Sequence, residues 1–307
     1  MPEAPQALPR GTSPLALLEL AGLSLGCVRS LDGGTAVGQV VEEKLSPDNL
    51  VHKHIASVKY EDVTFVLASP MAKDFYEWVK SVFDRKHLRK DLIFKRIDYD
   101  QNVISQLDVF HALLSGLTFP ELDASSKVPW ELAVRPTIDV SRMKPGTGKA
   151  ASLPLTKAKR WMSSNFRLTI PGLDCTHVNR IAAMSLTEDV TSDPVGEQRD
   201  YQKRPAPLHV PNLVVSLPEH MAKGFYDWHR RFVIDGINTA DKEKEGTLEI
   251  LSADLKEVLF TLKLRGLGIF RLKPDNPNDA GEVIRRVTAE MYCESMWFDY
   301  GPGAVAG

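Results

Sequence analysis

The stretch Met71-Ala-Lys-Asp-Phe-Tyr-Glu-Trp78 decides the fold of this chain because it occurs twice. It returns as Met221-Ala-Lys-Gly-Phe-Tyr-Asp-Trp228, with six of eight positions identical and a shift of 150 residues. The same shift aligns the apolar run Val63–Leu67 with Leu213–Leu217. A constant shift that holds for separate segments indicates two copies of one domain.

Composition marks where one copy ends and the next begins. The stretch from Ser141 to Lys159 is rich in Lys, Gly, Ser and Pro and has scarcely any large apolar residue, which is typical of a linker. We therefore predict a flexible N-terminus over residues 1–12, a first domain over 13–140, a linker over 141–160 and a second domain over 161–301. The second copy carries a longer polar loop, Asn238–Gly246, after which the shift changes.

One helix is predicted in each copy, directly after the repeated apolar run. Ser69 and Pro70 fit its first positions, as N-cap and first helical residue. Bulky apolar residues then recur at helical spacing and form one stripe, which must be buried. Aromatic residues in such a stripe are usually core rather than ligand contacts. The predicted core anchors are Phe75, Trp78, Phe225 and Trp228.

The remaining segments of each copy have the pattern of strands. Phe166–Ile170 alternates apolar and polar residues, as a half-buried strand does. Val63–Leu67 and Leu213–Leu217 are dense in β-branched residues, which favours strands buried on both faces. Later strands are expected at 92–97, 103–114 and 131–134, with counterparts at 247–251, 258–264 and 284–292. The sequence predicts a mainly β fold of two tandem β-barrels, each with one flanking α-helix.

Composition excludes several classes of protein. Hydrophobic residues make up 43% and charged residues 25% of the 307 residues, which is globular composition. The 38 basic and 40 acidic side chains leave a net charge of -2, which argues against general nucleic-acid binding. Three scattered cysteines fit a reducing compartment. No apolar run approaches the ~20 residues of a membrane span, and the N-terminus has no signal-like apolar core, so we expect synthesis in the cytoplasm.

The sequence motifs predict no enzyme, no cofactor and no metal site. His52-Lys-His54 has metal-like spacing but no third ligand close in sequence. Pro145-Gly-Thr-Gly-Lys149 lacks the first glycine and the Ser or Thr of a phosphate loop. Asp98, Asp100 and Asp108 are candidates for a carboxylate cluster, but Asp98–Asn102 is better explained as a polar hairpin turn.

Taken together, these features resemble the tail tube family of contractile-tailed phages and related contractile injection systems. The resemblance covers most of both halves and rests on the order and spacing of segments, none of which is catalytic. The segments that carry it are Lys53–Thr64, Met71–Val82, Phe119–Lys127 and Trp130–Pro136 in the first copy, and Asn165–Leu173, Phe225–Trp228 and Ile284–Phe298 in the second.

The resemblance implies a structural protein that associates with itself. Members of the family are single β-barrels with a flanking helix; six barrels join edge to edge into a ring, and rings stack into a hollow tube, a plan that the type VI secretion tube protein shares. It further implies sheath, baseplate or tube-end partners, DNA or an effector passing through the lumen without sequence-specific binding, and a final location in a virion tail or injection particle.

This chain departs from the family in fusing two divergent copies. Three chains would then make one pseudo-hexameric ring of alternating copies, or six chains would make two stacked rings of one copy each. We favour the three-chain ring, because fusion of non-identical neighbours is the direct route to a tube adaptor or initiator. Main tube and tube-end roles, and phage and injection-system origin, stay open.

Two loops are predicted to contact the adjacent ring, because the family carries a long hairpin between strands at this place. The first lies at Glu43–Leu50, and the second-copy analogue is near Asp193–Tyr201. A solvated loop is the alternative for both. A different class of function also stays open, namely a tandem β-barrel module that recognises a carbohydrate or peptide through its loops. The charged residues predicted to make the ring contacts are Glu43, Lys44, Asp48, Glu197 and Arg199.

Overall fold

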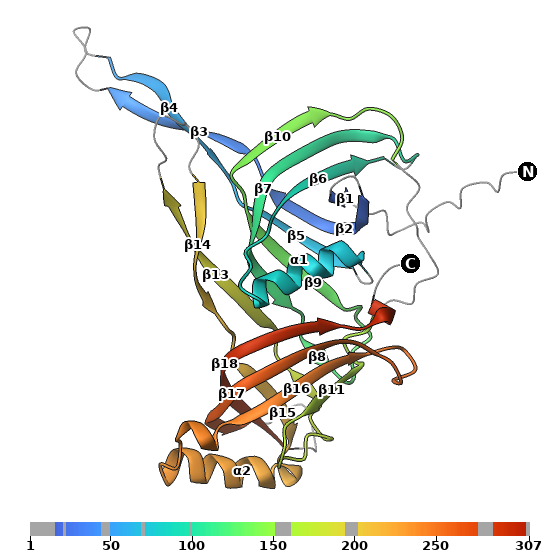
Figure 1. Cartoon of the computed structure of the whole chain (residues 1–307), viewed down its shortest axis with the longest axis vertical. Helices are drawn as coiled ribbons and strands as arrows, with labels where there is room; N and C mark the ends of the chain where they lie inside the picture. Colours follow the sequence, from blue (N-terminus) through green and yellow to red (C-terminus); the bar gives the residue numbers. More distant parts are fainter. Residues whose placement is uncertain are drawn as a thin grey trace, which may run out of the picture.

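A computed structural model describes residues 16–20, 23–43, 50–68, 71–98, 100–150, 161–193, 202–275 and 285–304 (Figure 1). We call the described residues up to 150 the first half and those from 161 the second half. The first half contains β1 (Ala16–Leu20), β2 (Leu23–Gly33), β3 (Ala36–Glu43), β4 (His52–Tyr60), β5 (Val63–Ala68), α1 (Lys73–Phe83), β6 (Arg89–Ile97), β7 (Val103–Phe119), β8 (Leu122–Asp123), β9 (Glu131–Thr137) and β10 (Val140–Pro145).

The second half repeats this order of elements with fewer and longer pieces. It contains β11 (Phe166–Thr169), β12 (Arg180–Ile181), β13 (Met184–Asp193), β14 (Gln202–His209), β15 (Leu213–Pro218), α2 (Lys223–His229), β16 (Lys244–Leu251), β17 (Val258–Pro274) and β18 (Arg286–Tyr300), and α2 continues into a π-helical turn, η2 (Arg230–Ile234). Short 3₁₀ turns lie at η1 (Glu219–Met221), η3 (Ala240–Lys242) and η4 (Pro302–Ala304).

Each half forms a barrel, which confirms the predicted fold class. In the first half, six strands pair in the cyclic order β1-β6-β7-β9-β5-β2 and the barrel closes where β2 pairs with β1. The second half has the corresponding order β11-β16-β17-β18-β15-β12, nearly closed. The duplication therefore extends from the sequence to the topology.

The two barrels also share their strand register. In the pairing of β7 with β9, Leu113 faces Thr137, and 155 residues later Gly268 of β17 faces Tyr292 of β18. The register shifts that follow lie at equivalent places. The pairing of β6 with β7 has a bulge at His111, and β16 with β17 has one at the equivalent Gly266. The backbone of this bulge is also similar, because His111 has a φ of 54° and Gly266 a φ of 64°. Register this similar is expected when both copies descend from one barrel.

The strands that flank the helices alternate between core and surface, so the prediction of burial on both faces is wrong. In β5, Val63, Phe65 and Leu67 are fully buried while the residues between them are exposed or half-buried. β15 has the same alternation. A barrel strand has one face toward the packed interior and the other toward the outside, whereas burial on both faces belongs to layered sheets.

Two predicted boundaries differ from the structure for local reasons. Helix α1 begins at Lys73 rather than at Pro70, because Ala72 is still extended and its N–H donates to the carbonyl of Leu25 on β2. The stretch predicted to begin the linker at Ser141 continues as β10 up to Pro145, where it pairs with β7. Residues 151–160 and the N-terminal residues 1–12 lie outside the described part of the chain.

Several strands are longer than their apolar patterns predicted. β7 and β17 are each 17 residues long, and β18 is 15. Register shifts in these strands change which side of the strand faces the core. Strict alternation is lost at each shift, so the pattern in the sequence stops before the strand does.

Trp78 packs at the centre of the first half, and we expect Trp78→Ala to lower the free energy of unfolding by about 3–5 kcal/mol. The side chain is fully buried, and its Nε1 donates to the carbonyl of Leu88 at 2.8 Å. Urea unfolding followed by far-UV circular dichroism measures the loss. The matched control is Trp297→Ala, a half-exposed ring under the Arg265 guanidinium, which should cost about 1 kcal/mol. Equal losses in the two variants would contradict the prediction.

Candidate assembly interface

The two halves are joined edge to edge by their backbones. Strand β7 runs past its own barrel, and its last residues pair on one side with β9 and on the other with β13 of the second half. Met184 faces Phe119, and Thr187 faces Gly116. The hydroxyl groups of Thr118 and Ser185, which face each other, lie 2.9 Å apart. A free strand edge of one barrel is thus satisfied by a strand of the next.

An aromatic cluster between α1 and β18 fills the space beside this edge. Tyr76 on α1 stacks on Phe298 and Tyr300 of β18, with ring centroids 6.3 and 5.1 Å apart. Phe83, the last residue of α1, stacks on Phe298 at 5.8 Å. Burial raises the pKa of Tyr76, so the phenol stays neutral. Figure 1 shows α1 lying between its own barrel and β18. The helix of the first half therefore belongs to both barrels.

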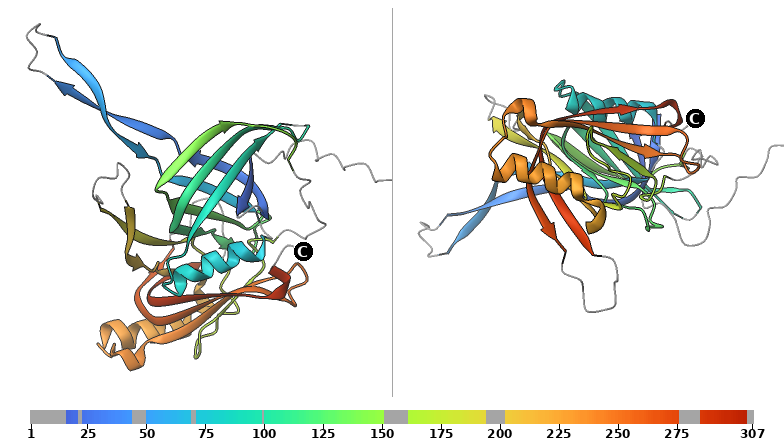
Figure 2. Two further views of the ribbon diagram at one scale, coloured as in Figure 1. Left: turned by 45° about the horizontal axis from the view of Figure 1, so that its top comes forward. Right: turned by 90° about the horizontal axis from the view of Figure 1, so that it is seen from below.

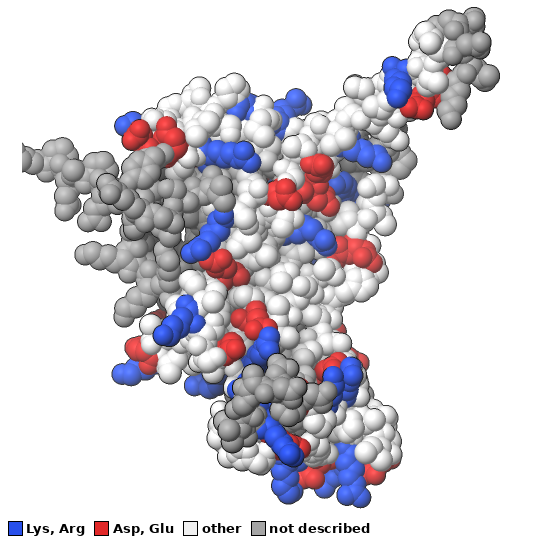
Figure 3. Space-filling model, turned by 180° about the vertical axis from the view of Figure 1, so that it is seen from behind, with Lys and Arg blue, Asp and Glu red and all other residues white. Residues whose placement is uncertain are grey.

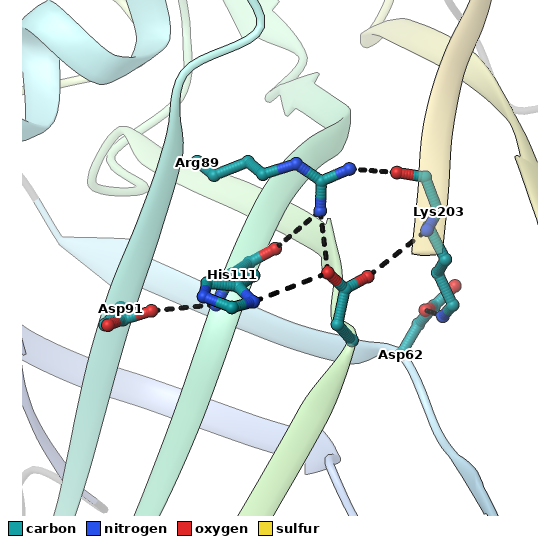
Figure 4. A network of polar contacts seen from close by, with 6 residues as sticks. Asp62, Arg89, Asp91, His111 and Lys203 are labelled. Carbon is teal, nitrogen blue, oxygen red and sulfur yellow. Dashed lines mark hydrogen bonds and ion pairs between the residues drawn. The ribbon is translucent and has the colours of Figure 1, made fainter. Parts of the chain in front are cut away.

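The β13–β14 hairpin rests on the first barrel through a polar network (Figure 4). Arg89 Nη1 on β6 donates to Asp139 Oδ2 at 2.8 Å, and its other terminal nitrogen donates to the carbonyl of Lys203 on β14. Lys203 Nζ in turn donates to Asp62 Oδ1 at 3.0 Å. His111 Nδ1 lies 3.6 Å from Asp139 Oδ2. Asp139 lies in the two-residue break between β9 and β10.

A buried carboxylate marks the same junction. Glu188 on β13 is almost fully buried, and its Oε1 lies 3.1 Å from Nδ1 of His87 in the connection after α1. Burial raises the pKa of Glu188, and the contact with His87 and the charge of Arg85 offset this only in part. Further along, β8 of the first half pairs with β12 of the second. The junction thus combines strand pairing, stacking and charge.

The residues predicted as core anchors are buried side chains on α1 and α2. Phe75, Trp78 and Phe225 are at most 1% exposed, and Trp228 is 7% exposed. Of the predicted ring-contact residues, Glu43 ends β3 and is exposed at the far part of the β3–β4 hairpin. The other four, Lys44, Asp48, Glu197 and Arg199, lie outside the described residues.

The histidine pair and the glycine-containing stretch both lie along strands. His52 and His54 lie on β4, where His54 Nδ1 is 4.0 Å from Glu43, and the described residues contain no group of three metal-ligating side chains. The glycine-containing stretch after Pro145 continues the pairing along β7, where Gly148 accepts from the N–H of Val103.

The acidic residues considered as a cluster are separated. Asp98 turns the chain between β6 and β7 by accepting from the backbone and side chain of Asn102, which confirms the predicted hairpin turn and lowers the pKa of Asp98. Asp108 lies on β7. Burial alone would raise the pKa of Asp108, but hydrogen bonds from Lys144 and Gln106 outweigh that and lower it.

The sequence pattern does not indicate that Tyr76, Arg89 and Asp139 belong to the junction. Tyr76 repeats as Tyr226 within the motif but lies off the apolar stripe, and this repetition is the signal that the sequence offers.

Acidic and basic side chains are interspersed on the face in Figure 3, without a broad patch of one sign. An open hollow of about 460 Å³ lies beside the junction, between the turn after α1 and β18. No described helix has the length and apolar character that crossing a membrane requires.

No family model matches the chain, and no curated protein matches its sequence. Solved structures to which it is similar include the extended sheath–tube complex of an extracellular contractile injection system (TM-score 0.37, 14% identity, 50% of this chain and 100% of that one). Others are the baseplate of the anti-feeding prophage (0.36, 14%, 44% and 91%) and Hcp1 from Flavobacterium johnsoniae (0.27, 14%, 45% and 96%).

Glu188→Gln is expected to stabilise the protein more at pH 8 than at pH 5. Because the folded pKa of Glu188 is raised, the unfolded chain ionises first as the pH rises above about 4.3, and the wild type loses stability up to the folded pKa. Glutamine removes that loss. Urea midpoints of both proteins at the two pH values test this, with the exposed Glu257→Gln as the control for loss of one charge. A gain that is larger at pH 5 would contradict the assignment.

Proposed function

We propose that this chain is a structural subunit of a phage tail or contractile injection system tube, and that it associates with copies of itself into rings around a central lumen. The observation that carries the proposal is the pairing of β7 with β13. It makes the two barrels of one chain neighbours that share a sheet edge, which is the contact a ring of barrels needs between each pair of members.

The same pairing favours three chains over six in a ring. A ring built of first halves alone would need the outer edge of β7 for the next first half. That edge is occupied by β13 of the same chain. Alternation of first and second halves leaves this contact in place, so three chains would supply the six barrels that the resemblance implies.

The remaining parts of the proposal follow from a tube. Sheath, baseplate or tube-end proteins would contact the outside and the ends of the assembly, and DNA or an effector would pass through the lumen without specific binding. The interspersed charges on the visible face suit a wall that does not hold nucleic acid tightly (Figure 3). The chains would be made in the cytoplasm and would act in the assembled virion tail or injection particle.

Light scattering after size exclusion, together with electron microscopy of the same fractions, tests the proposal. We expect a species of three times the chain mass of 34.2 kDa, whose fraction increases with protein concentration. Its images should show a ring with a central opening. Rings that contain six copies of one half would remove the three-chain model and retain the structural role. A chain that stays monomeric over the whole accessible concentration range would overturn the proposal and favour a binding module.

A further inference from the structure

We infer that a second copy of this chain docks with its β3 edge, at Thr35–Val37, against the β17 edge at Arg271–Lys273. The inference rests on the proposed function, because it names the residues through which copies associate. It follows from comparing the junction inside the chain with the equivalent residues that face outward.

The first component is the hairpin β3–β4, which is equivalent to the hairpin β13–β14. Val37 faces Lys59, and 150 residues later Thr187 faces His209. The equivalence holds for the further pairs out to Glu43 and Asp193 except Gln39 with Ser57, and both register shifts lie just before Val40 and its equivalent, Val190. Yet β13 also pairs with β7 on its other edge, whereas among the described residues β3 pairs with β4 alone. Figure 2 shows this hairpin standing clear of the barrels.

The second component is the end of β17, which is equivalent to the end of β7 by a shift of 155. On one side, Arg271 faces Glu290 of β18, just as Gly116 faces Arg135 of β9. On the other side, β16 pairs with β17 only as far as Leu267. Within the described part of the chain no strand pairs beyond that point. This is the edge at which β7 receives β13.

Burial differs between the two edges in the direction that a missing partner requires. Leu117 is 1% exposed and Phe119 2% exposed beside β13. Their equivalents, Leu272 and Pro274, are half-buried and exposed. Thr35, the equivalent of Ser185, lies just before the first paired residue of β3, whereas Ser185 is within a strand because β7 pairs with it.

The helix contact shows the same asymmetry. Tyr76 is buried against β18, but its equivalent on α2, Tyr226, is 37% exposed. Phe298, which Tyr76 contacts, is 5% exposed, and its equivalent on β10, Met143, is 59% exposed. Val233, the equivalent of Phe83, is 44% exposed. Apolar side chains that are buried within the chain at one junction are therefore exposed at both components of the other.

The charged side chains beside the two edges are of opposite sign. The equivalence sets Lys273 opposite Thr35, whose hydroxyl donates to the Glu61 carboxylate, so an acid of one chain would approach a base of the next. The two edges consist of different residues, so the contact between copies is head to tail, and such a contact closes into a ring when the rotation between successive chains closes.

The register assigned from β7 and β13 gives the pairs Thr35 with Lys273, Ala36 with Leu272, and Val37 with Arg271. Disulfide cross-linking tests it directly. Thr35→Cys and Lys273→Cys occupy the positions equivalent to Ser185 and Thr118, whose side chains meet. On mild oxidation the double variant should give a ladder of covalent oligomers ending at the closed ring. A mixture of the two single variants should stop at dimers.

Two controls make the result decisive. Thr118→Cys with Ser185→Cys should form the equivalent disulfide within one chain, which shows that this pair of positions is competent. Thr35→Cys with Leu272→Cys places the two sulfurs on opposite faces of the sheet and should remain uncross-linked. If the protein forms rings and the within-chain pair oxidises while Thr35→Cys/Lys273→Cys stays monomeric on a denaturing gel, the assigned junction is wrong and the ring role stands. If the protein never associates, both fall.

Discussion

The backbone edge of a barrel strand that extends beyond its barrel is the constraint on which the rest of this structure depends. β7 and β17 are each 17 residues long, and part of each has a neighbour on only one side within its own barrel. Unpaired N–H and C=O groups along such an edge recruit another strand. In the first half that strand comes from the same chain, and the position of the second half follows from it.

Stacking and charge then fix the geometry that strand pairing leaves open. Tyr76 and Phe83 hold β18 against α1, and Arg89 with Asp139 holds β14 against the first barrel. These contacts lie on both sides of the shared edge and resist rotation about it. The two copies differ at some of these positions, where Thr118 corresponds to Lys273 and Phe298 to Met143.

Sequence patterns located the helices and most strands but not their extents. The stripe through Phe75 and Trp78 could be found because a helix keeps its period of 3.6 residues throughout. The sequence predicts β7 and β17 too short, because register shifts such as that between Leu114 and Gly116 change the face of the strand and interrupt the alternation. The face burial of β5 was misjudged because a dense β-branched run does not distinguish a barrel strand from one in a layered sheet.

By itself, the sequence determined that the chain is a duplication, that each copy is mainly β with one helix, and which aromatic residues are in the cores, because repetition and periodicity are local properties of the chain. Only the tertiary structure decided which edge of one barrel meets the other, since a strand edge is recognised by its backbone and leaves little trace in side-chain composition. It likewise brought Arg89, Asp139 and Lys203 together from three distant segments. Contacts of that kind depend on register across the sheet, which no local pattern specifies.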